Sequence, residues 1–223
     1  MKFNQFDIYS LSEHAVTIEF GSEISEYLLQ QITGFDQLVH HYPFTGFTAT
    51  VPAYTTLSVF FDPLQVISSG LPGDDCFEKI SNYLNQLKGK QEISTTAAGN
   101  LITIPVCYND EFGPDLAEVA ALHHLTHEEV IRLHSTAVYK VYMIGFVPGF
   151  AYLGGMTDKL ATPRKSTPRK AIPAGAVGIA GRQTGVYPLE TPGGWQLIGQ
   201  TPLKLFDANR AQPSLLKAGD EVI

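Results

Sequence analysis

The sequence predicts an α+β protein with two domains, an N-terminal antiparallel sheet with two helices and a C-terminal β-barrel or sandwich. Two observations lead to this fold class. In roughly the first 88 residues, short stretches of alternating apolar and polar residues are mixed with two stretches of helical periodicity. From Tyr139 onward, short apolar runs alternate with proline and glycine turns every 8–12 residues, as in all-β domains.

The predicted N-terminal domain covers residues 1–88. Alternating patterns predict four strands in it, at residues 6–10, 15–20, 47–51 and 56–61. Ser22 is the predicted N-cap of a first helix that runs to about residue 41, and Asp74 or Asp75 is the predicted N-cap of a second. The order of these elements predicts an antiparallel sheet with both helices on one face.

Residues 89–100 are small and polar and show no apolar periodicity, so we interpret them as a linker between the domains. The second domain, residues 101–223, is expected to begin with a strand at residues 101–108. Two short helices follow, the first at residues 115–122. The second begins with the capping-box spacing of Thr126 and Glu129 and ends near residue 135.

Composition excludes several classes of protein. A net charge of −7 argues against nonspecific binding to nucleic acid, which needs a basic face. No apolar run is long enough to span a membrane, and the N-terminus lacks the pattern of a signal peptide, so we expect a cytoplasmic protein. Two cysteines are too few for a disulfide framework. The histidines near residue 124 lack the spacing of zinc ligands, and we expect no metal.

The segment from Val141 to Phe206 differs from the rest of the chain. It contains 11 of the 20 glycines and 7 of the 14 prolines. It also has seven lysines and arginines against two acidic residues, although the whole chain is acidic. A rigid and locally basic surface of this kind predicts a site for an anionic group.

Aromatic residues between the glycines of this segment are candidate walls of a ligand pocket. They lie in a glycine-rich stretch or beside a Gly-Gly turn, and comprise Phe146, Phe150, Tyr152 and Trp195, with Pro148 between the first two. Glycine lets the backbone approach a ligand closely, and aromatic rings form pocket walls. The alternative is a sharp bend in a barrel whose aromatic side chains belong to the core.

Two groups of polar positions are candidates for binding an anion or an amide. Arg164 and Arg169 stand five residues apart in a proline-stiffened repeat, and two guanidinium groups suit a carboxylate or a phosphate. Arg182, Gln183 and Thr184 follow a predicted buried strand at residues 177–180 and are expected in an exposed turn. The alternatives are a solvated basic loop and ordinary turn chemistry.

His134 is a candidate catalytic general base, because it lies just before the glycine-rich stretch. The alternative is a histidine that interacts with the dipole at the end of a helix. We place His134 with Arg164 and Arg169 in a tentative catalytic group.

Several blocks of sequence resemble the allophanate hydrolase subunit 1 family, which includes the B subunit of 5-oxoprolinase together with KipI proteins. The blocks span essentially the whole chain and comprise residues 51–54, 61–63, 104–108, 111–116, 142–155, 163–164, 168–169, 180–188 and 191–195. Two departures from the family pattern are Ser12-Glu13-His14, where many relatives have Gly-Asp, and a short segment after Asp220.

The resemblance implies a cyclophilin-like β-barrel as the second domain. It implies one component of an ATP-dependent 5-oxoprolinase that opens 5-oxo-L-proline to L-glutamate and is expected to be inactive alone, with ATP as a co-substrate and no cofactor bound to this chain. The implied partners are the 5-oxoprolinase C subunit, also called allophanate hydrolase subunit 2, and the A subunit, a third component of the LamB/YcsF type. The alternatives are a KipI-type inhibitor that binds a sporulation histidine kinase and a component of urea carboxylase.

Overall fold

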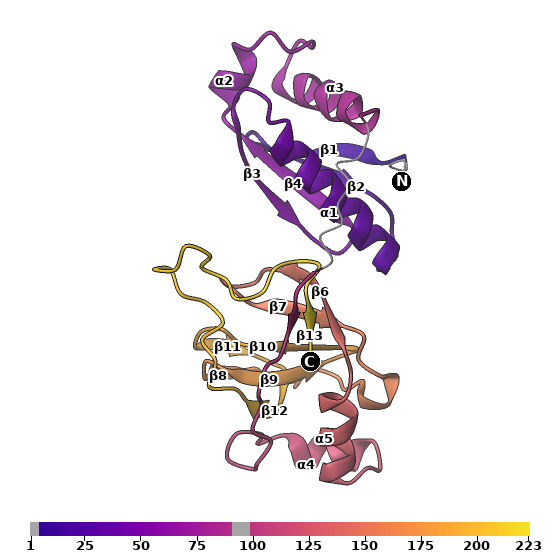
Figure 1. The fold of residues 1–223 in the computed structure, drawn as a ribbon, viewed down its shortest axis with the longest axis vertical. Coiled ribbons are helices and arrows are strands. Elements are labelled where there is room, and N and C mark those ends of the chain that lie inside the picture. The colour runs from indigo at the N-terminus through magenta and orange to yellow at the C-terminus, as the bar shows by residue number, and fades with distance from the viewer. Residues whose placement is uncertain (1–4, 91–98) are drawn as a thin grey trace. The chain divides into compact units, whose positions relative to one another are not determined.

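The computed structural model describes residues 5–90 and 99–223 (Figure 1). The chain divides into two compact units, Met1–Ala98 and Gly99–Ile223. Most of the predicted linker, residues 91–98, lies outside the described residues. Among the helices that are described, none is both long enough and apolar enough to cross a lipid bilayer.

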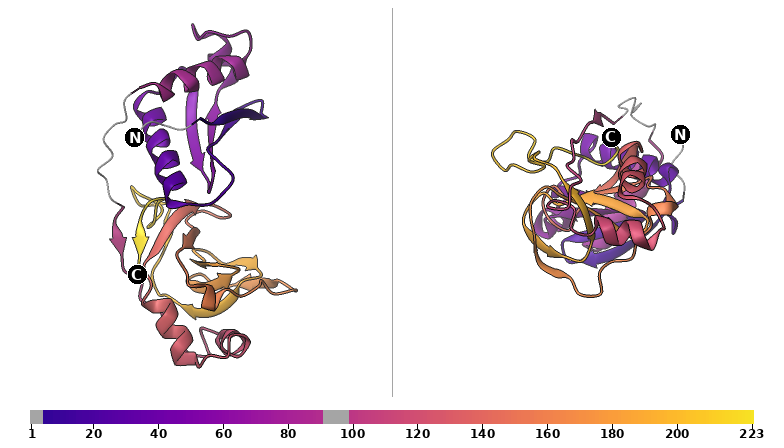
Figure 2. Two further views of the ribbon diagram at one scale, coloured as in Figure 1. Left: turned by 90° about the vertical axis from the view of Figure 1, so that its right-hand side faces the viewer. Right: turned by 90° about the horizontal axis from the view of Figure 1, so that it is seen from below.

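The N-terminal unit is a four-stranded antiparallel sheet in the order β1-β2-β4-β3. Its strands and helices are β1 (Asp7–Ser12), β2 (Ala15–Glu19), α1 (Glu26–His41), β3 (Phe47–Pro52), β4 (Thr56–Phe61), α2 (Pro63–Ile67) and α3 (Cys76–Lys88). One face of the sheet packs against α1 and α3 around a core that includes Ile18, Phe35, Leu57 and Ile80 (Figures 1 and 2). The predicted α+β class and the antiparallel N-terminal sheet with helices are confirmed.

Helix boundaries in this unit follow from side-chain caps. The backbone N–H of Leu28 donates to Ser25 Oγ, so Ser25 caps α1, and the prediction of Ser22 was wrong. Asp75 caps α3, as one of the two predicted alternatives. Asp62 caps α2, a five-residue helix that is too short to give a periodic signal and was not predicted.

The C-terminal unit contains a seven-stranded mixed sheet in the order β12-β9-β10-β7-β6-β13-β5 and a two-stranded ribbon of β11 and β8. Its elements are β5 (Leu101–Ile102), α4 (Leu116–Leu122), α5 (His127–Ser135), β6 (Tyr139–Ile144), β7 (Ala151–Gly154), the 3₁₀ helix η1 (Asp158–Leu160), β8 (Arg169–Ile172), β9 (Ala176–Ala180), β10 (Gln183–Val186), β11 (Thr191–Gly193), β12 (Gln196–Gln200) and β13 (Glu221–Val222).

Two elements of this unit differ from their predictions. The strand expected at residues 101–108 is reduced to β5, since Pro105 cannot donate to a ladder, and Cys107 forms only an isolated bridge with Gln200. The expected exposed turn after β9 is short, and Thr184 is a buried residue of β10. The helix predicted from a capping box is confirmed as α5, where both bonds between Thr126 and Glu129 form.

A buried carboxylate, Asp115, ties three parts of the C-terminal unit together. Its side chain at the start of α4 is only 3% exposed. One oxygen accepts from Arg169 Nη2 at 2.8 Å and pairs with Lys165 Nζ at 2.9 Å, and the other accepts from the Leu197 N–H at 2.7 Å. Asp115 therefore joins α4, the basic segment that leads into β8, and β12.

We predict that Asp115→Asn destabilises the C-terminal unit by about 3 kcal/mol, because it leaves Arg169 partly buried without its counter-charge. Urea unfolding followed by the fluorescence of Trp195, the chain's one tryptophan, measures this unit specifically. Asp158→Asn is the matched control, since it removes a carboxylate from an exposed ion pair with Arg182 and should change the midpoint little. Equal effects of the two substitutions would contradict the anchoring role of Asp115.

Candidate functional site

Aromatic side chains and one arginine line a small pocket in the C-terminal unit, here called the aromatic pocket. Its volume is about 120 Å³, and its lining residues are Phe146, Phe150, Tyr152, Arg164, Tyr187, Pro192, Gly193, Gly194 and Trp195. The four aromatic residues proposed from the sequence thus come together with one of the proposed arginines. Tyr187 is an additional member that the sequence argument missed.

The rings of this pocket pack edge to face around Phe150. Its centroid lies 4.8 Å from that of Tyr152, 5.2 Å from that of Tyr187 and 5.3 Å from that of Trp195. Phe150 and Trp195 are both almost fully buried, so they belong to the core and form the pocket wall at the same time. The two interpretations of these aromatics, pocket wall and core, are therefore compatible.

Phe146 occupies the mouth of the pocket in an unusual conformation. Its backbone has φ of 68°, and the Val147 N–H donates to the Gly145 carbonyl across it at 2.8 Å. This is the rare, strained form of γ-turn, which a bulky residue seldom adopts. The side chain is nevertheless 60% exposed. Strain combined with an exposed aromatic ring marks Phe146 as a residue with a role outside the core.

Arg164 is the cation of the aromatic pocket, and its neighbours in the chain hold it there. The Lys165 N–H donates to the Gly194 carbonyl at 2.7 Å, and Gln196 Nε2 donates to the Pro163 carbonyl at 3.1 Å. Arg164 itself is exposed and has no carboxylate partner within residues 5–90 and 99–223. Its guanidinium is therefore available for a ligand.

The phenol of Tyr187 stays protonated beside Arg164. Burial raises its pKa to about 12, although a backbone hydrogen bond with Trp195 and the positive charge of Arg164 act in the opposite direction. At neutral pH the positive charge of Arg164 thus lies beside the uncharged phenol of Tyr187. This electrostatic environment suits a small anion with an apolar body.

The other arginines proposed from the sequence lie elsewhere. Arg169 is held by Asp115, and Arg182 forms two hydrogen bonds of 2.7 Å with the carboxylate of Asp158. Pro148 is exposed and Gln183 is half-buried at the start of β10. None of these four residues lines the aromatic pocket.

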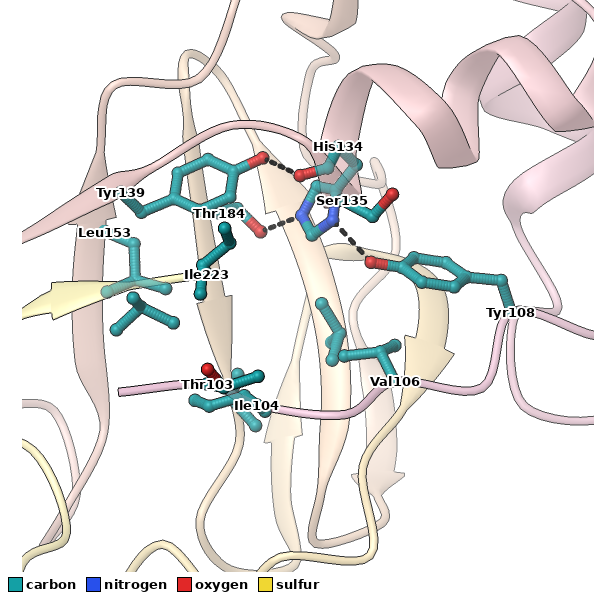
Figure 3. A pocket seen from close by; sticks show the side chains of 13 residues that line it. Thr103, Ile104, Val106, Tyr108, His134, Ser135, Tyr139, Leu153, Thr184 and Ile223 are labelled. Atoms are coloured by element: carbon teal, nitrogen blue, oxygen red, sulfur yellow. Dashed lines mark hydrogen bonds between the residues drawn. The ribbon is translucent and has the colours of Figure 1, made fainter. Parts of the chain in front are cut away.

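A larger cavity, here called the histidine cavity, contains His134 (Figure 3). Its volume is about 390 Å³, and its lining residues are Thr103, Ile104, Val106, Tyr108, His134, Ser135, Tyr139, Leu153, Val177, Thr184, Val186, Val222 and Ile223. His134 and Thr184 were both proposed from the sequence, and they meet here rather than beside the arginines. The tentative catalytic group of His134, Arg164 and Arg169 is therefore divided among three places.

A chain of hydrogen bonds fixes the imidazole of His134. Thr184 Oγ1 donates to the Gly178 carbonyl at 3.0 Å, so it accepts a hydrogen bond from His134 Nε2–H at 2.8 Å. The other nitrogen, Nδ1, then accepts from the Tyr108 hydroxyl at 2.8 Å. This arrangement assigns a neutral imidazole with its proton on Nε2.

The surroundings of His134 keep the ring neutral. Burial lowers its pKa to about 4. Burial also raises the pKa of Tyr108 to about 12 and raises that of Tyr139, whose hydroxyl donates to the His134 carbonyl at 2.6 Å. Both ring nitrogens are hydrogen-bonded, so in this arrangement His134 holds Tyr108 and Thr184 in position, and its role as a general base stays a prediction.

Three tyrosines of these sites, Tyr108, Tyr139 and Tyr187, were missed from the sequence. Tyr108 and Tyr187 do lie in blocks that resemble the allophanate hydrolase subunit 1 family, so those blocks were the available signal. Within the part of the chain that is described, no group of three or more histidine, cysteine or acidic side chains could hold a metal ion.

Comparison with known proteins shows which class of domain this chain contains and which protein family it belongs to. The family described as carboxyltransferase domain, subdomain C and D, matches residues 6–216. The 5-oxoprolinase B subunit of Bacillus subtilis (strain 168) is 45% identical over 223 residues, which cover 98% of this chain and 91% of the relative. The protein of the same name from Escherichia coli O157:H7 is 38% identical, with 96% and 93% covered. The chain belongs to the 5-oxoprolinase B-subunit family.

A solved structure agrees with this assignment. The crystal structure of TTHA0988 superposes with a TM-score of 0.79 at 36% sequence identity, and the match covers 93% of this chain. It covers only 39% of the TTHA0988 chain, which is thus more than twice as long.

We predict that His134 makes the C-terminal unit sensitive to acid. Its folded pKa of about 4 lies below the ordinary value of 6.5, so between these values the unfolded chain binds a proton that the folded chain does not. The stability contributed by neutral His134 is fully present above pH 6.5 and falls by about 1.4 kcal/mol for each pH unit down to pH 4.

Urea unfolding of the C-terminal unit at a series of pH values between these limits tests the prediction. His134→Asn should remove this contribution to the fall of the unfolding free energy with decreasing pH, whatever its effect on stability at neutral pH. His124→Asn is the control, since His124 is exposed and Asn tolerates its left-handed backbone. An unchanged slope in His134→Asn would show that the acid sensitivity has another source.

Proposed function

We propose that this chain is the B subunit of an ATP-dependent 5-oxoprolinase complex, which opens 5-oxo-L-proline to L-glutamate together with partner subunits. The observation that supports this most strongly is the 45% identity with a 5-oxoprolinase B subunit over nearly the full length of both chains.

The chemistry of the reaction explains why ATP is required. A five-membered lactam is an unreactive amide, so the γ-phosphoryl group of ATP is transferred to the lactam oxygen, and ADP leaves. Water then adds to the activated carbon, the C–N bond breaks with protonation of nitrogen, and a second water releases phosphate. The sequence contains no phosphate-binding loop, so we place ATP on another protein of the complex.

The aromatic pocket is our proposed subsite for the lactam acid. The pocket, at about 120 Å³, is smaller than a dry apolar cavity of about 150 Å³ that holds benzene, so it has room for the five-membered ring alone, and the carboxylate would extend toward the exposed Arg164. Arg164 would bind the carboxylate of 5-oxoproline in two hydrogen bonds, and Phe150 and Tyr152 would pack against the ring. Arg169 and Arg182 are engaged by Asp115 and Asp158, so we assign them to the scaffold.

We further propose that partner subunits complete this pocket. The expected partners are the 5-oxoprolinase C subunit, which is the allophanate hydrolase subunit 2 protein, and the A subunit, of the LamB/YcsF type. The exposed and strained Phe146 at the pocket mouth is the proposed contact. A relative in which the matched region is fused to a longer chain is consistent with obligate association.

We also propose that the curved seven-stranded sheet and the β11–β8 ribbon correspond to a cyclophilin-like barrel, and that residues 1–88 and 101–223 are the two domains. The backbone bridge between Cys107, in the segment that continues from the edge strand β5, and Gln200, in the other edge strand β12, supports a sheet that folds back on itself. A histidine kinase as partner and a cytoplasmic location stay predictions.

Reconstitution tests the proposed function directly. This chain and its two expected partners, the C and A subunits, are mixed with ATP and 5-oxo-L-proline, and the release of L-glutamate and ADP is measured. We expect turnover with all three proteins and none when this chain is omitted. Turnover at the same rate without this chain would overturn the proposal, as would inhibition of a sporulation histidine kinase by a chain that supports no turnover.

We predict that Arg164→Gln raises the KM for 5-oxoproline in the complex by roughly 10- to 100-fold, because a charge-assisted hydrogen bond to the carboxylate is lost. The kcat should change much less, since the carboxylate is bound equally in the ground and transition states. Arg182→Gln is the matched control and should leave KM unchanged. A normal KM in Arg164→Gln would remove the aromatic pocket from consideration as the substrate site.

A further inference from the structure

The histidine cavity has the properties of a second ligand site. It opens to solvent beside the exposed residues Thr103 and Ser135, so a small molecule can enter it. This cavity is about three times the volume of the aromatic pocket, at 390 Å³ against 120 Å³. Most of its wall is formed by aliphatic side chains of β7, β9, β10 and β13 and of the segment after β5 (Figure 3). A cavity of this size within the unit is a candidate site for a small molecule.

The fixed imidazole of His134 sets the hydrogen-bonding character of the two tyrosines in the wall, which also includes the hydroxyl groups of Thr103 and Ser135. The Tyr108 hydroxyl donates its hydrogen bond to His134 Nδ1, and the Tyr139 hydroxyl donates to the His134 carbonyl (Figure 3). Each phenol oxygen therefore retains lone pairs but has no proton to offer. The tyrosines that line the cavity thus act as hydrogen-bond acceptors, and a ligand that meets them must donate.

The cavity also selects against charge. Its lining residues include no lysine, arginine, aspartate or glutamate, and His134 is neutral. An ion of either sign in this place would lose part of its hydration without meeting a charged side chain, which is unfavourable. Carboxylates and phosphates are therefore expected to bind at sites such as the aromatic pocket, where the Arg164 guanidinium is available.

We propose that the histidine cavity binds a small uncharged molecule with an apolar body and one N–H or O–H group, which donates to the Tyr108 hydroxyl oxygen. Neutral lactams and secondary amides belong to this class. His134 acts as a positioning residue, because its Nδ1 orients the phenol so that a lone pair faces the ligand. The proposal concerns a different site from the lactam acid subsite and does not depend on the proposed function.

The test uses ε-caprolactam as a neutral donor probe and titrates it into the full chain while methyl ¹³C NMR spectra are recorded. We expect shifts of the cavity methyl groups of Leu153, Val177 and Val186, with a Kd on the order of 1 mM for a ligand of this size. N-methylcaprolactam has no N–H and should bind roughly fivefold more weakly. 5-Oxoproline, which is anionic, should leave these methyl groups unshifted.

Two variants locate the contact. Tyr108→Phe should weaken ε-caprolactam binding roughly fivefold, because it removes the hydroxyl oxygen that accepts from the lactam N–H. It should leave the binding of N-methylcaprolactam unaffected, because that lactam has no N–H to donate. Val106→Phe adds volume from a half-buried position on the cavity wall and should abolish binding of both lactams while the spectrum stays dispersed.

Three results would overturn the proposal. The cavity methyl groups could fail to shift with ε-caprolactam, the two lactams could bind the wild-type chain equally, or binding could persist in Val106→Phe. The comparison of the two lactams needs only the wild-type chain, so the proposal stays testable even if Tyr108→Phe does not fold.

Discussion

The carboxylate of Asp115 is the interaction on which the arrangement of the C-terminal unit depends. Burial alone would raise its pKa, but hydrogen bonds from Arg169 and Lys165 outweigh that effect and hold the pKa below its usual value. Lys165 and Arg169 both follow Arg164 in the sequence, and both form salt bridges with the Asp115 carboxylate. With Lys165 also bonded through its backbone to Gly194, Arg164 is left to project into the aromatic pocket. A buried charge that supports the scaffold thus determines which arginine is free.

The aromatic pocket and the histidine cavity are suited to ligands of different charge. The aromatic pocket combines a free guanidinium with aromatic walls, whereas the histidine cavity is uncharged and surrounded by aliphatic side chains. Trp195 and Thr184, both candidate ligand-binding residues from the sequence, line different cavities. The difference follows from the alternation of β10, which directs Thr184 to the histidine side of the sheet while Gly185 packs against Phe150 and Trp195.

Local patterns in the sequence predicted much of the fold, but contacts between residues far apart in the sequence could not be predicted. The capping box of α5, the alternation of β2 and β4 and the breaks at proline each depend on a few neighbouring residues. The hydrogen-bonded chain of Tyr108, His134 and Thr184 joins residues up to 76 positions apart, and no spacing rule describes it. Phe146, Phe150 and Tyr152 were predictable because they alternate with glycine within residues 145–155, and Trp195 because it follows Gly193-Gly194. Tyr187 lies outside both of these segments.

The basic surface expected for residues 141–206 is less extensive in the structure than its sequence suggests. The segment from Val141 to Phe206 has seven cations and two acids, which suggested a broad basic surface. In the structure, Lys165 and Arg169 pair with Asp115, Arg182 pairs with Asp158, and Lys204 pairs with Asp207. Asp115 and Asp207 lie outside the segment, so counting charge along the chain overstates the field that a ligand meets. The other three cations of the segment are Lys159, Arg164 and Lys170, and among them only Arg164 lines the aromatic pocket. A single guanidinium in a pocket of this size favours one carboxylate over a polyanion such as ATP.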